Sequence, residues 1–211
     1  MKNYLFSGNI NDIAKNLLKQ DLINAKVLVG IAAGNDSDKN DMYFYEGTDE
    51  YPAAVSIFKE VSSIGTFKLL DKRIVKKQAQ KILKTADVIY LAGGNPYIQL
   101  KYIKDNGLDA ILQSFKGIII GVSAGSMNQG KIAYYCKDED YFETKIYDGI
   151  GLVDVTIDPH YDVLNEEQVS ENRKWSEQIP IIGLPNDSFI VVNNGKVTIY
   201  GENYQYYNKT K

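Results

Sequence analysis

Short, nearly continuous apolar segments alternate with longer amphipathic segments through the first part of the chain. The apolar segments are rich in valine, isoleucine and leucine, and glycine or polar residues bound them. Strands of a parallel sheet have this pattern because helices cover both faces of the sheet. The expected strands are 25–33, 66–71, 86–94 and 117–125, and the expected helices are 51–65, 73–85, 96–107 and 108–116.

The last part of the chain has a different pattern. Residues 151–162 contain a strand with alternating apolar and polar residues, and 165–178 is expected to be a surface helix capped by Asn165. A short buried strand is expected at 180–185. Two β-rich runs within 188–201 flank Asn-Asn-Gly, which predicts a hairpin and so adds antiparallel strands at one edge of the sheet.

The size and composition of the chain suit one globular domain. It has 211 residues, of which 44% are hydrophobic, enough to bury a sizeable core. We therefore expect an α/β fold, with a mostly parallel sheet flanked by helices on both faces and a C-terminal antiparallel hairpin, in a single domain spanning 1–211.

Charge and hydropathy argue against several classes of partner. The net charge is −3 and the basic residues are scattered, which is unlike a nucleic-acid-binding surface. No apolar run approaches the ~20 residues of a membrane span. The N-terminal segment is too polar for a secretory signal. We expect a cytoplasmic protein with neither a membrane nor a nucleic acid as partner.

The chain contains one cysteine, Cys136, and one histidine, His160. A single cysteine excludes an internal disulfide and a cysteine-based metal cluster. A single histidine excludes a zinc site built on several imidazoles. No metal or other cofactor is expected, and any imidazole base in this protein must be His160.

The segment G-V-S-A-G at 121–125 follows an apolar strand and precedes a helix-like segment. This pattern is typical of a sharp turn that lifts a nucleophilic serine, here Ser123, above the sheet. The backbone amide of Ala124 could then stabilise an oxyanion. The alternative is that Ser123 only caps the following helix, in a strand-to-helix turn of small residues.

Two further loops are expected at the same edge, because ligands of parallel sheets bind beyond the carboxyl ends of the strands. Gly93-Gly94-Asn95 ends the strand 86–94, and the amide of Gly94 could be a second oxyanion donor. His160 follows another strand, in T-I-D-P-H-Y-D. Either loop could instead be structural, but a serine nucleophile needs such an imidazole to take its proton.

The imidazole of a catalytic triad also needs a partner on its far nitrogen, normally a carboxylate. Asp138 lies between the serine and the histidine in the sequence, in a run of acidic residues. Asp140 and two glutamates compete with it there, and Asp158 precedes the histidine by two residues. The spacing alone does not choose among these acids.

Three motifs occur in the same order as in a known family. "IYLAGGNPYIQL", "IIIGVSAGSM" and "VTIDPHY" resemble the Gly-Gly-Asn loop, the Ser-Ala-Gly turn and the Pro-His strand of the S51 serine peptidases. That family includes peptidase E, the aspartyl dipeptidases and, more distantly, cyanophycinase. The resemblance implies a three-layer, flavodoxin-like fold similar to class I glutamine amidotransferases. It also implies hydrolysis, without metal, of the bond after an N-terminal Asp.

The resemblance assigns catalytic roles residue by residue. Ser123 matches the nucleophile and His160 the base. Asp138 falls where the resemblance places the acid of the triad. Gly94 and Ala124 match the oxyanion-hole positions. The substrate would be a small peptide, and the protein a monomer or a homodimer.

For substrate binding the resemblance implies Asn95 and Arg173, with the arginine, or a nearby lysine, receiving the acidic side chain of the substrate. Two positions depart from the family pattern. Pro96 replaces the usual threonine after Gly-Gly-Asn, and Ser126 follows Ser-Ala-Gly where glycine or alanine is common.

We therefore expect a serine peptidase acting on dipeptides with an N-terminal Asp through a Ser-His-Asp triad and an acyl-enzyme. One alternative is a non-catalytic amidotransferase-like domain that binds a small acidic metabolite or a partner. Another is an α/β-hydrolase esterase, which shares the order Ser, acid, His but usually carries its histidine closer to the C-terminus.

Overall fold

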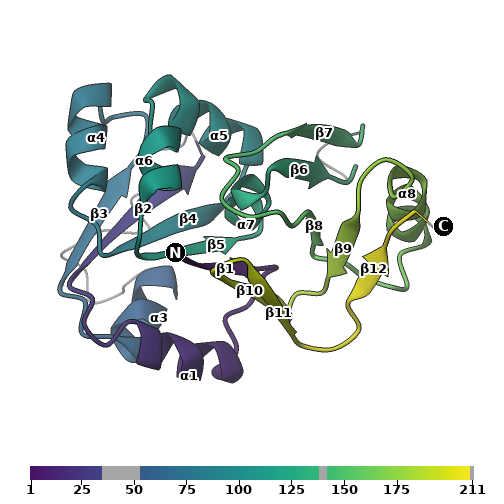
Figure 1. The fold of residues 1–211 in the computed structure, drawn as a ribbon, viewed down its shortest axis with the longest axis horizontal. Coiled ribbons are helices and arrows are strands. Elements are labelled where there is room, and N and C mark those ends of the chain that lie inside the picture. Colours follow the sequence, from purple (N-terminus) through teal and green to yellow (C-terminus); the bar gives the residue numbers. More distant parts are fainter. Residues whose placement is uncertain (35–52, 138–141, 210–211) are drawn as a thin grey trace.

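The computed structural model describes residues 1–34, 53–137 and 142–209 (Figure 1). A seven-stranded sheet in the order β11-β10-β1-β5-β4-β2-β3 forms its centre. The strands from β1 to β3 in this order run parallel, and β10 and β11 add an antiparallel hairpin at one edge. This confirms the predicted fold class. Its strands are β1 (Lys2–Phe6), β2 (Val27–Ala33), β3 (Thr66–Leu70), β4 (Val88–Gly94), β5 (Ile118–Val122), β10 (Phe189–Asn193) and β11 (Lys196–Tyr200).

Helices cover both faces of this sheet, as predicted (Figure 1). Two of them pack their apolar residues on one face in a core with Tyr4, Phe6 and Tyr90. Three others pack on the opposite face in a core with Val29, Ile89 and Ile119. The first pair is α1 (Asp12–Asp21) and α3 (Ala53–Val61), and the second group is α4 (Lys76–Leu83), α5 (Pro96–Asp105) and α6 (Asp109–Ser114).

Strand β1 lies in the sheet interior, between β5 and β10, although the sequence patterns above did not indicate it. Tyr4, Leu5 and Phe6 are fully buried there. The hairpin that covers the edge turns through Asn194 and Gly195, both with positive φ (49° and 82°), as the Asn-Gly pattern predicts.

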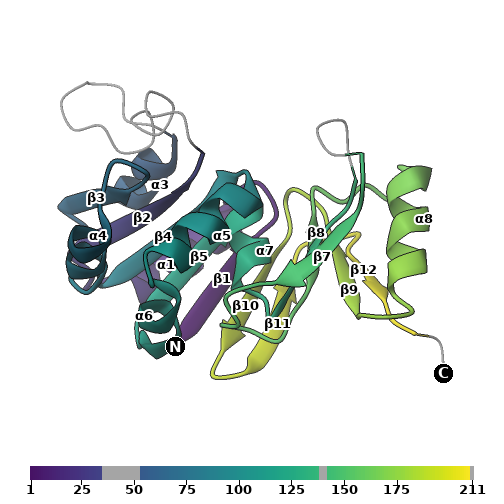
Figure 2. The ribbon, with the colours of Figure 1, turned by 90° about the horizontal axis from the view of Figure 1, so that it is seen from above.

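A second, three-stranded sheet in the order β12-β9-β8 lies beside the main sheet, with α8 (Glu166–Trp175) next to it (Figures 1 and 2). Its strands are β8 (Ile157–Pro159), β9 (Ile181–Leu184) and β12 (Gln205–Tyr207). Strands β6 (Ile132–Tyr135) and β7 (Lys145–Asp148) pair with each other as a separate antiparallel ribbon. Leu5 and Ile190 of the main sheet share a core with Ile157 and Leu184 of the second sheet. The strand expected within 151–162 corresponds to β8, which is only three residues long.

Candidate active site

Ser123 occupies the sharp turn between β5 and the short helix α7 (Ala124–Gln129). Its backbone has φ 48° and ψ −110°, in a region that residues with a side chain seldom occupy. Its amide donates to Phe6 O at 2.9 Å, so the end of β1 helps to hold the turn. This is the strained strand-to-helix geometry that the G-x-S-x-G pattern predicts.

The glycines on either side of Ser123 allow the close approach of α7 to the sheet. A Cβ placed on Gly125 would lie 2.0 Å from Leu91 O in β4, and one on Gly121 would lie 2.5 Å from Gln129 Nε2. Real Cβ atoms do not approach backbone oxygen so closely. Glycine is therefore required at 125 by contact with rigid backbone.

Gly125→Ala is expected to destabilise the protein by about 3 kcal/mol or more, because α7 must move away from β4 to make room for the methyl group. Urea unfolding followed by circular dichroism measures this loss. Gly65→Ala is the matched control, since nothing lies within 4 Å of a Cβ at Gly65. Equal stability of the two variants would contradict this account of the turn.

His160 follows β8 and points its ring at the serine. Its Nε2 lies 2.8 Å from Ser123 Oγ. The backbone of His160 has a positive φ of 56°, and its amide donates to Ser7 Oγ at 2.7 Å. Ser7 Oγ in turn donates to Leu184 O of β9 at 2.7 Å. The second sheet and the end of β1 thus fix the imidazole against the main sheet, and the two predicted residues meet.

The far nitrogen of the imidazole, Nδ1, lies 2.5 Å from Oδ1 of Asn186 in the loop between β9 and β10. An amide oxygen can only accept, so Nδ1 carries a hydrogen, and in the neutral imidazole Nε2 then presents its lone pair to Ser123 Oγ. This is the tautomer that a general base needs. The motifs did not indicate Asn186, because an asparagine after Leu-Pro is typical of an ordinary turn.

Of the aspartates proposed as the third member of the triad, Asp158 is the one within the described residues, and it does not hydrogen-bond the ring. Asp138 and Asp140 lie outside the described residues. The carboxylate of Asp158 accepts from Asn172 Nδ2 at 2.7 Å instead. The described partner of His160 Nδ1 is the neutral Asn186.

A cavity of about 960 Å³ opens beside the serine and the histidine. Gly94 and Ala124, the expected oxyanion donors, both line it. The amide of Ala124 opens α7, where a helix offers no acceptor of its own. Gly94 has a φ of 128°, a conformation that suits only glycine.

Neither of the two expected substrate-binding residues is among the described residues that line this cavity. The side-chain oxygen of Asn95 caps α5, accepting from the amides of Tyr97 and Ile98 at 3.0 and 3.1 Å. Arg173 lines a different cavity, together with residues of the C-terminal segment. Glu167 and Gln168 are the residues of α8 that line the cavity beside Ser123. Arg173 follows them by five and six positions and so projects from another side of the helix.

Asp158 is a buried carboxyl in the wall of the active-site cavity, with a relative exposure of 2%. Burial raises its pKa to about 7, although hydrogen bonds from Asn172 and Gln168 act in the opposite direction. In the unfolded chain the same carboxyl ionises near pH 4. Between about pH 4 and 7 the folded state therefore holds a proton on Asp158 that the unfolded state has released. The contribution of this carboxyl to the free energy of unfolding falls as the pH rises through that window.

Asp158→Asn is expected to raise the free energy of unfolding relative to the original protein at pH 8, with a smaller gain at pH 5. The upper limit of the difference is on the order of 4 kcal/mol, because the ionised buried carboxylate is costly only in the folded state. Urea unfolding at both pH values measures it. Asp154→Asn is the control, since Asp154 is exposed and its change should give no such pH dependence. A gain that is the same at both pH values would contradict the shifted pKa.

No helix in the described parts of the chain is long and apolar enough to cross a membrane.

The structure resembles a candidate peptidase E protein from Listeria monocytogenes EGD-e, with a TM-score of 0.68 and 21% identity over 96% of this chain and 98% of that one. It also resembles a peptidase from an acI-B1 Actinobacterium, with a TM-score of 0.61 and 14% identity over 100% of this chain and 95% of that one. These similarities support the fold.

Sequence comparison is more specific about the family. Peptidase E from Citrobacter koseri is 29% identical over 133 residues, which are 57% of this chain and 58% of the relative. Peptidase E from Escherichia coli is 27% identical over 136 residues, 59% of each chain. The chain thus matches less than two thirds of the length of these curated relatives. The profile of peptidase family S51 matches residues 60–200, which include Ser123 and His160, and this chain belongs to peptidase family S51.

Proposed function

We propose that this protein is a serine peptidase that cleaves short peptides through an acyl-enzyme on Ser123. The observation that carries the proposal is the 2.8 Å separation of Ser123 Oγ and His160 Nε2 at the wall of a large cavity. A serine hydroxyl is a poor nucleophile until a base takes its proton, and His160 is in place to do so. Membership of family S51 supports the same activity.

In the proposed reaction, Ser123 Oγ attacks the carbonyl carbon of the peptide bond while His160 Nε2 accepts the hydroxyl proton. The imidazolium then gives this proton to the leaving amine, and an ester on Ser123 remains. A water molecule, deprotonated by His160, hydrolyses the ester and releases the free acid. The amides of Gly94 and Ala124 would stabilise the tetrahedral oxyanion in each half of the reaction.

In this proposal Asn186 orients the imidazole. Its amide oxygen keeps the hydrogen on Nδ1 and holds the ring toward Ser123. Peptidases with a Cys-His-Asn arrangement use a neutral amide in the same position. Asp138, which the resemblance to the family implies for this role, is the competing candidate, and mutation separates the two.

The alternative of a non-catalytic domain requires that the serine and the histidine be out of reach of each other, and the 2.8 Å contact argues against it. The preference for an N-terminal Asp lacks a binding group among the described residues. Lys137 lines the cavity, but its ammonium lies 2.6 Å from Glu167 Oε1. We therefore propose peptidase activity without a requirement for aspartate.

A panel of dipeptides and tripeptides with acidic, basic and neutral N-terminal residues tests the proposal, with products separated by liquid chromatography. A fluorophosphonate probe should also label the protein once, at Ser123, as found by mass spectrometry of its peptides. Esters tested beside the peptides address the esterase alternative. If nothing in the panel were cleaved and Ser123 remained unlabelled, the protein would not be a serine peptidase.

A further inference from the structure

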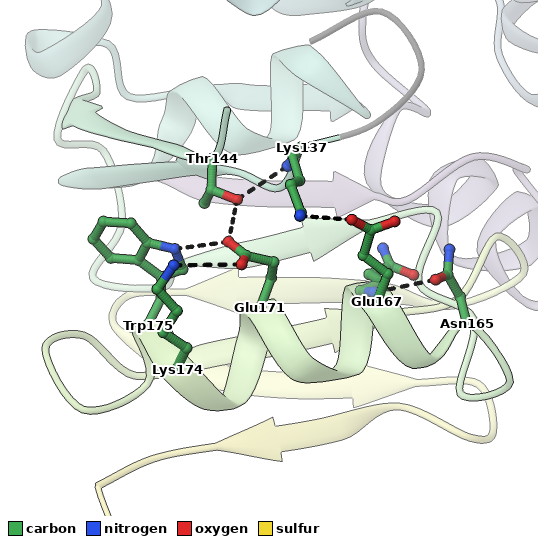
Figure 3. A network of polar contacts seen from close by, with 8 residues as sticks. Lys137, Thr144, Asn165, Glu167, Glu171, Lys174 and Trp175 are labelled. Carbon is green, nitrogen blue, oxygen red and sulfur yellow. Dashed lines mark hydrogen bonds and ion pairs between the residues drawn. The ribbon is translucent and has the colours of Figure 1, made fainter. Parts of the chain in front are cut away.

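Two of the charged side chains that line the cavity beside Ser123 form an ion pair, and a third does not. Lys137, Asp158 and Glu167 are the lysine and the two acids among its lining residues. Figure 3 shows Lys137 directed at Glu167, with 2.6 Å between Nζ and Oε1. This pair leaves the carboxyl of Asp158 as the charged group of the cavity wall without an ion pair in the described ranges.

The hydrogen bonds of Asp158 come from neutral groups. Its Oδ2 accepts from Asn172 Nδ2 at 2.7 Å, and the side chain of Gln168 is its other donor. Amides satisfy the lone pairs of a carboxylate but leave its charge. No ion pair of Asp158 occurs among the described residues, and a buried carboxylate without a cation is costly. A bound cation would remove that cost.

The wall that carries Asp158 is braced by contacts between α8 and the β6–β7 ribbon. Glu171 on α8 accepts from Thr144 Oγ1 at 2.6 Å and from Trp175 Nε1 at 3.0 Å (Figure 3). The bond from Thr144, together with the pair of Lys137 and Glu167, fastens α8 to the ends of the β6–β7 ribbon, and the bond from Trp175 holds Glu171 in place within the helix. Asn172, the donor to Asp158, lies on the same helix and is fully buried. The carboxylate is therefore held in position before a ligand arrives, which favours binding.

We infer that Asp158 binds a positively charged group on the residue whose carbonyl Ser123 attacks. This inference rests on the proposed function, because an acyl-enzyme on Ser123 places that residue in the cavity that Asp158 lines. The cation is either the side chain of lysine or arginine or the free α-ammonium of an N-terminal residue. An acidic side chain in the same place would meet a carboxylate of like charge.

Matched substrates test the inference by turnover. Lysyl-leucine and norleucyl-leucine differ by one ammonium at the end of the side chain. If the side chain is the cation, kcat/KM is expected to be on the order of 100-fold higher for the lysyl peptide. Asp158→Asn should remove that ratio while changing kcat/KM of the norleucyl peptide less than about threefold, and Asp154→Asn should change neither. An equal loss on both peptides in Asp158→Asn would overturn the side-chain assignment.

The α-ammonium is separated from the side chain by acetylation. If the α-ammonium is the cation, lysyl and norleucyl peptides are cleaved at similar rates, and Asp158→Asn slows both. Nα-acetyl-lysyl-leucine is then a poor substrate of the original protein, and Asp158→Asn does not slow it further. If Asp158→Asn slowed free and acetylated peptides of both kinds alike, Asp158 would have only a structural role, and both assignments would fail.

Binding without turnover separates this inference from the proposed peptidase activity. Ser123→Ala is titrated by calorimetry with lysinamide, norleucinamide and Nα-acetyl-lysinamide, and the titrations are repeated after adding Asp158→Asn. At least one of these three compounds should bind to Ser123→Ala through its α-ammonium or its side-chain ammonium. Its Kd should be at least tenfold higher in the double variant, which lacks the carboxylate of Asp158. If the original protein turned over none of the peptides while this binding was intact, the peptidase would be refuted and the inference spared. Equal affinities in both proteins would refute the inference.

The original protein offers a test that needs no variant at Asp158. The titratable and charged groups around this carboxyl are Tyr134, Cys136, Lys137, His160, Tyr161, Glu167, Glu171 and Arg173. Burial raises the pKa of Cys136 to about 12 and raises the pKa values of Tyr134 and Tyr161 as well. Burial also acts to raise the pKa of Glu171, but hydrogen bonds from Thr144 and Trp175 outweigh it and lower this pKa. His160 acts on both substrates in the same way, so its effect cancels in the ratio of their kcat/KM values. If the side chain is the cation, the preference for the lysyl over the norleucyl peptide should therefore rise as the pH passes from 6 to 8, and a flat ratio would contradict the side-chain assignment.

Discussion

Ser123→Ala is expected to lower kcat/KM by at least ~10⁴-fold on every peptide that the protein cleaves, because no other group can form the acyl-enzyme. The fold should survive, since the described hydrogen bond of the Ser123 side chain is the one to His160 Nε2, and the backbone bonds of the turn remain. Initial rates on the best peptide of the panel measure the loss. Circular dichroism and the urea midpoint show whether the fold is intact.

The control for this prediction is Ser114→Ala, a serine-to-alanine change at the exposed end of α6, which should leave the rate unchanged. His160→Ala should cost about as much as Ser123→Ala, and the double variant little more than either, because the two side chains act as one unit. Additive losses, or a Ser123→Ala variant with more than about a tenth of the original activity, would show that the hydrolysis occurs at another site.

The main elements of the fold could be predicted because their apolar periods are local. Strands 86–94 and 117–125 and the helix 96–107 each have a pattern that is independent of the remainder of the chain. Strand β1 could not be recognised in this way. It is five residues long, and what makes it a central strand is its pairing with β5 and β10, which are distant in the sequence.

The candidate site was predictable to the extent that chemistry restricts it. With one histidine in the chain, any imidazole base had to be His160, and its place after a strand brought it to the edge where Ser123 lies. Asn186 was not predictable, because its role follows from the packing of the second sheet against β1. Arg173 lines a different cavity from Ser123, and a sequence pattern could not show this because it gives the helix but not the side of the helix that faces the cavity.

Two variants at Asn186 should distinguish the effect of the orientation of the His160 ring from the effect of a negative charge beside it. Asn186→Leu removes the acceptor from Nδ1, so the ring can turn away from Ser123, and kcat is expected to fall on the order of 100-fold. Asn186→Asp keeps an acceptor and adds a carboxylate beside the imidazolium that forms in the transition state. It should keep or raise kcat and shift the acidic limb of the pH–rate profile upward by about one unit. Steady-state rates between pH 5 and 9 measure both effects.

Asn9→Ala is the matched control for these variants. It removes the hydrogen bond from Asn9 to Asp187, beside Asn186, without touching the ring, and should leave kcat and the pH profile unchanged. Asp138→Asn decides between the two candidates for orienting His160. If Asn186 holds the ring, Asp138→Asn should change kcat less than about threefold, because a charge that does not contact the ring acts on it only at long range and is screened. If instead Asp138→Asn cost as much as Asn186→Leu was expected to cost, and Asn186→Leu cost little, a carboxylate would hold the imidazole during catalysis, and the contact with Asn186 would belong only to the resting enzyme.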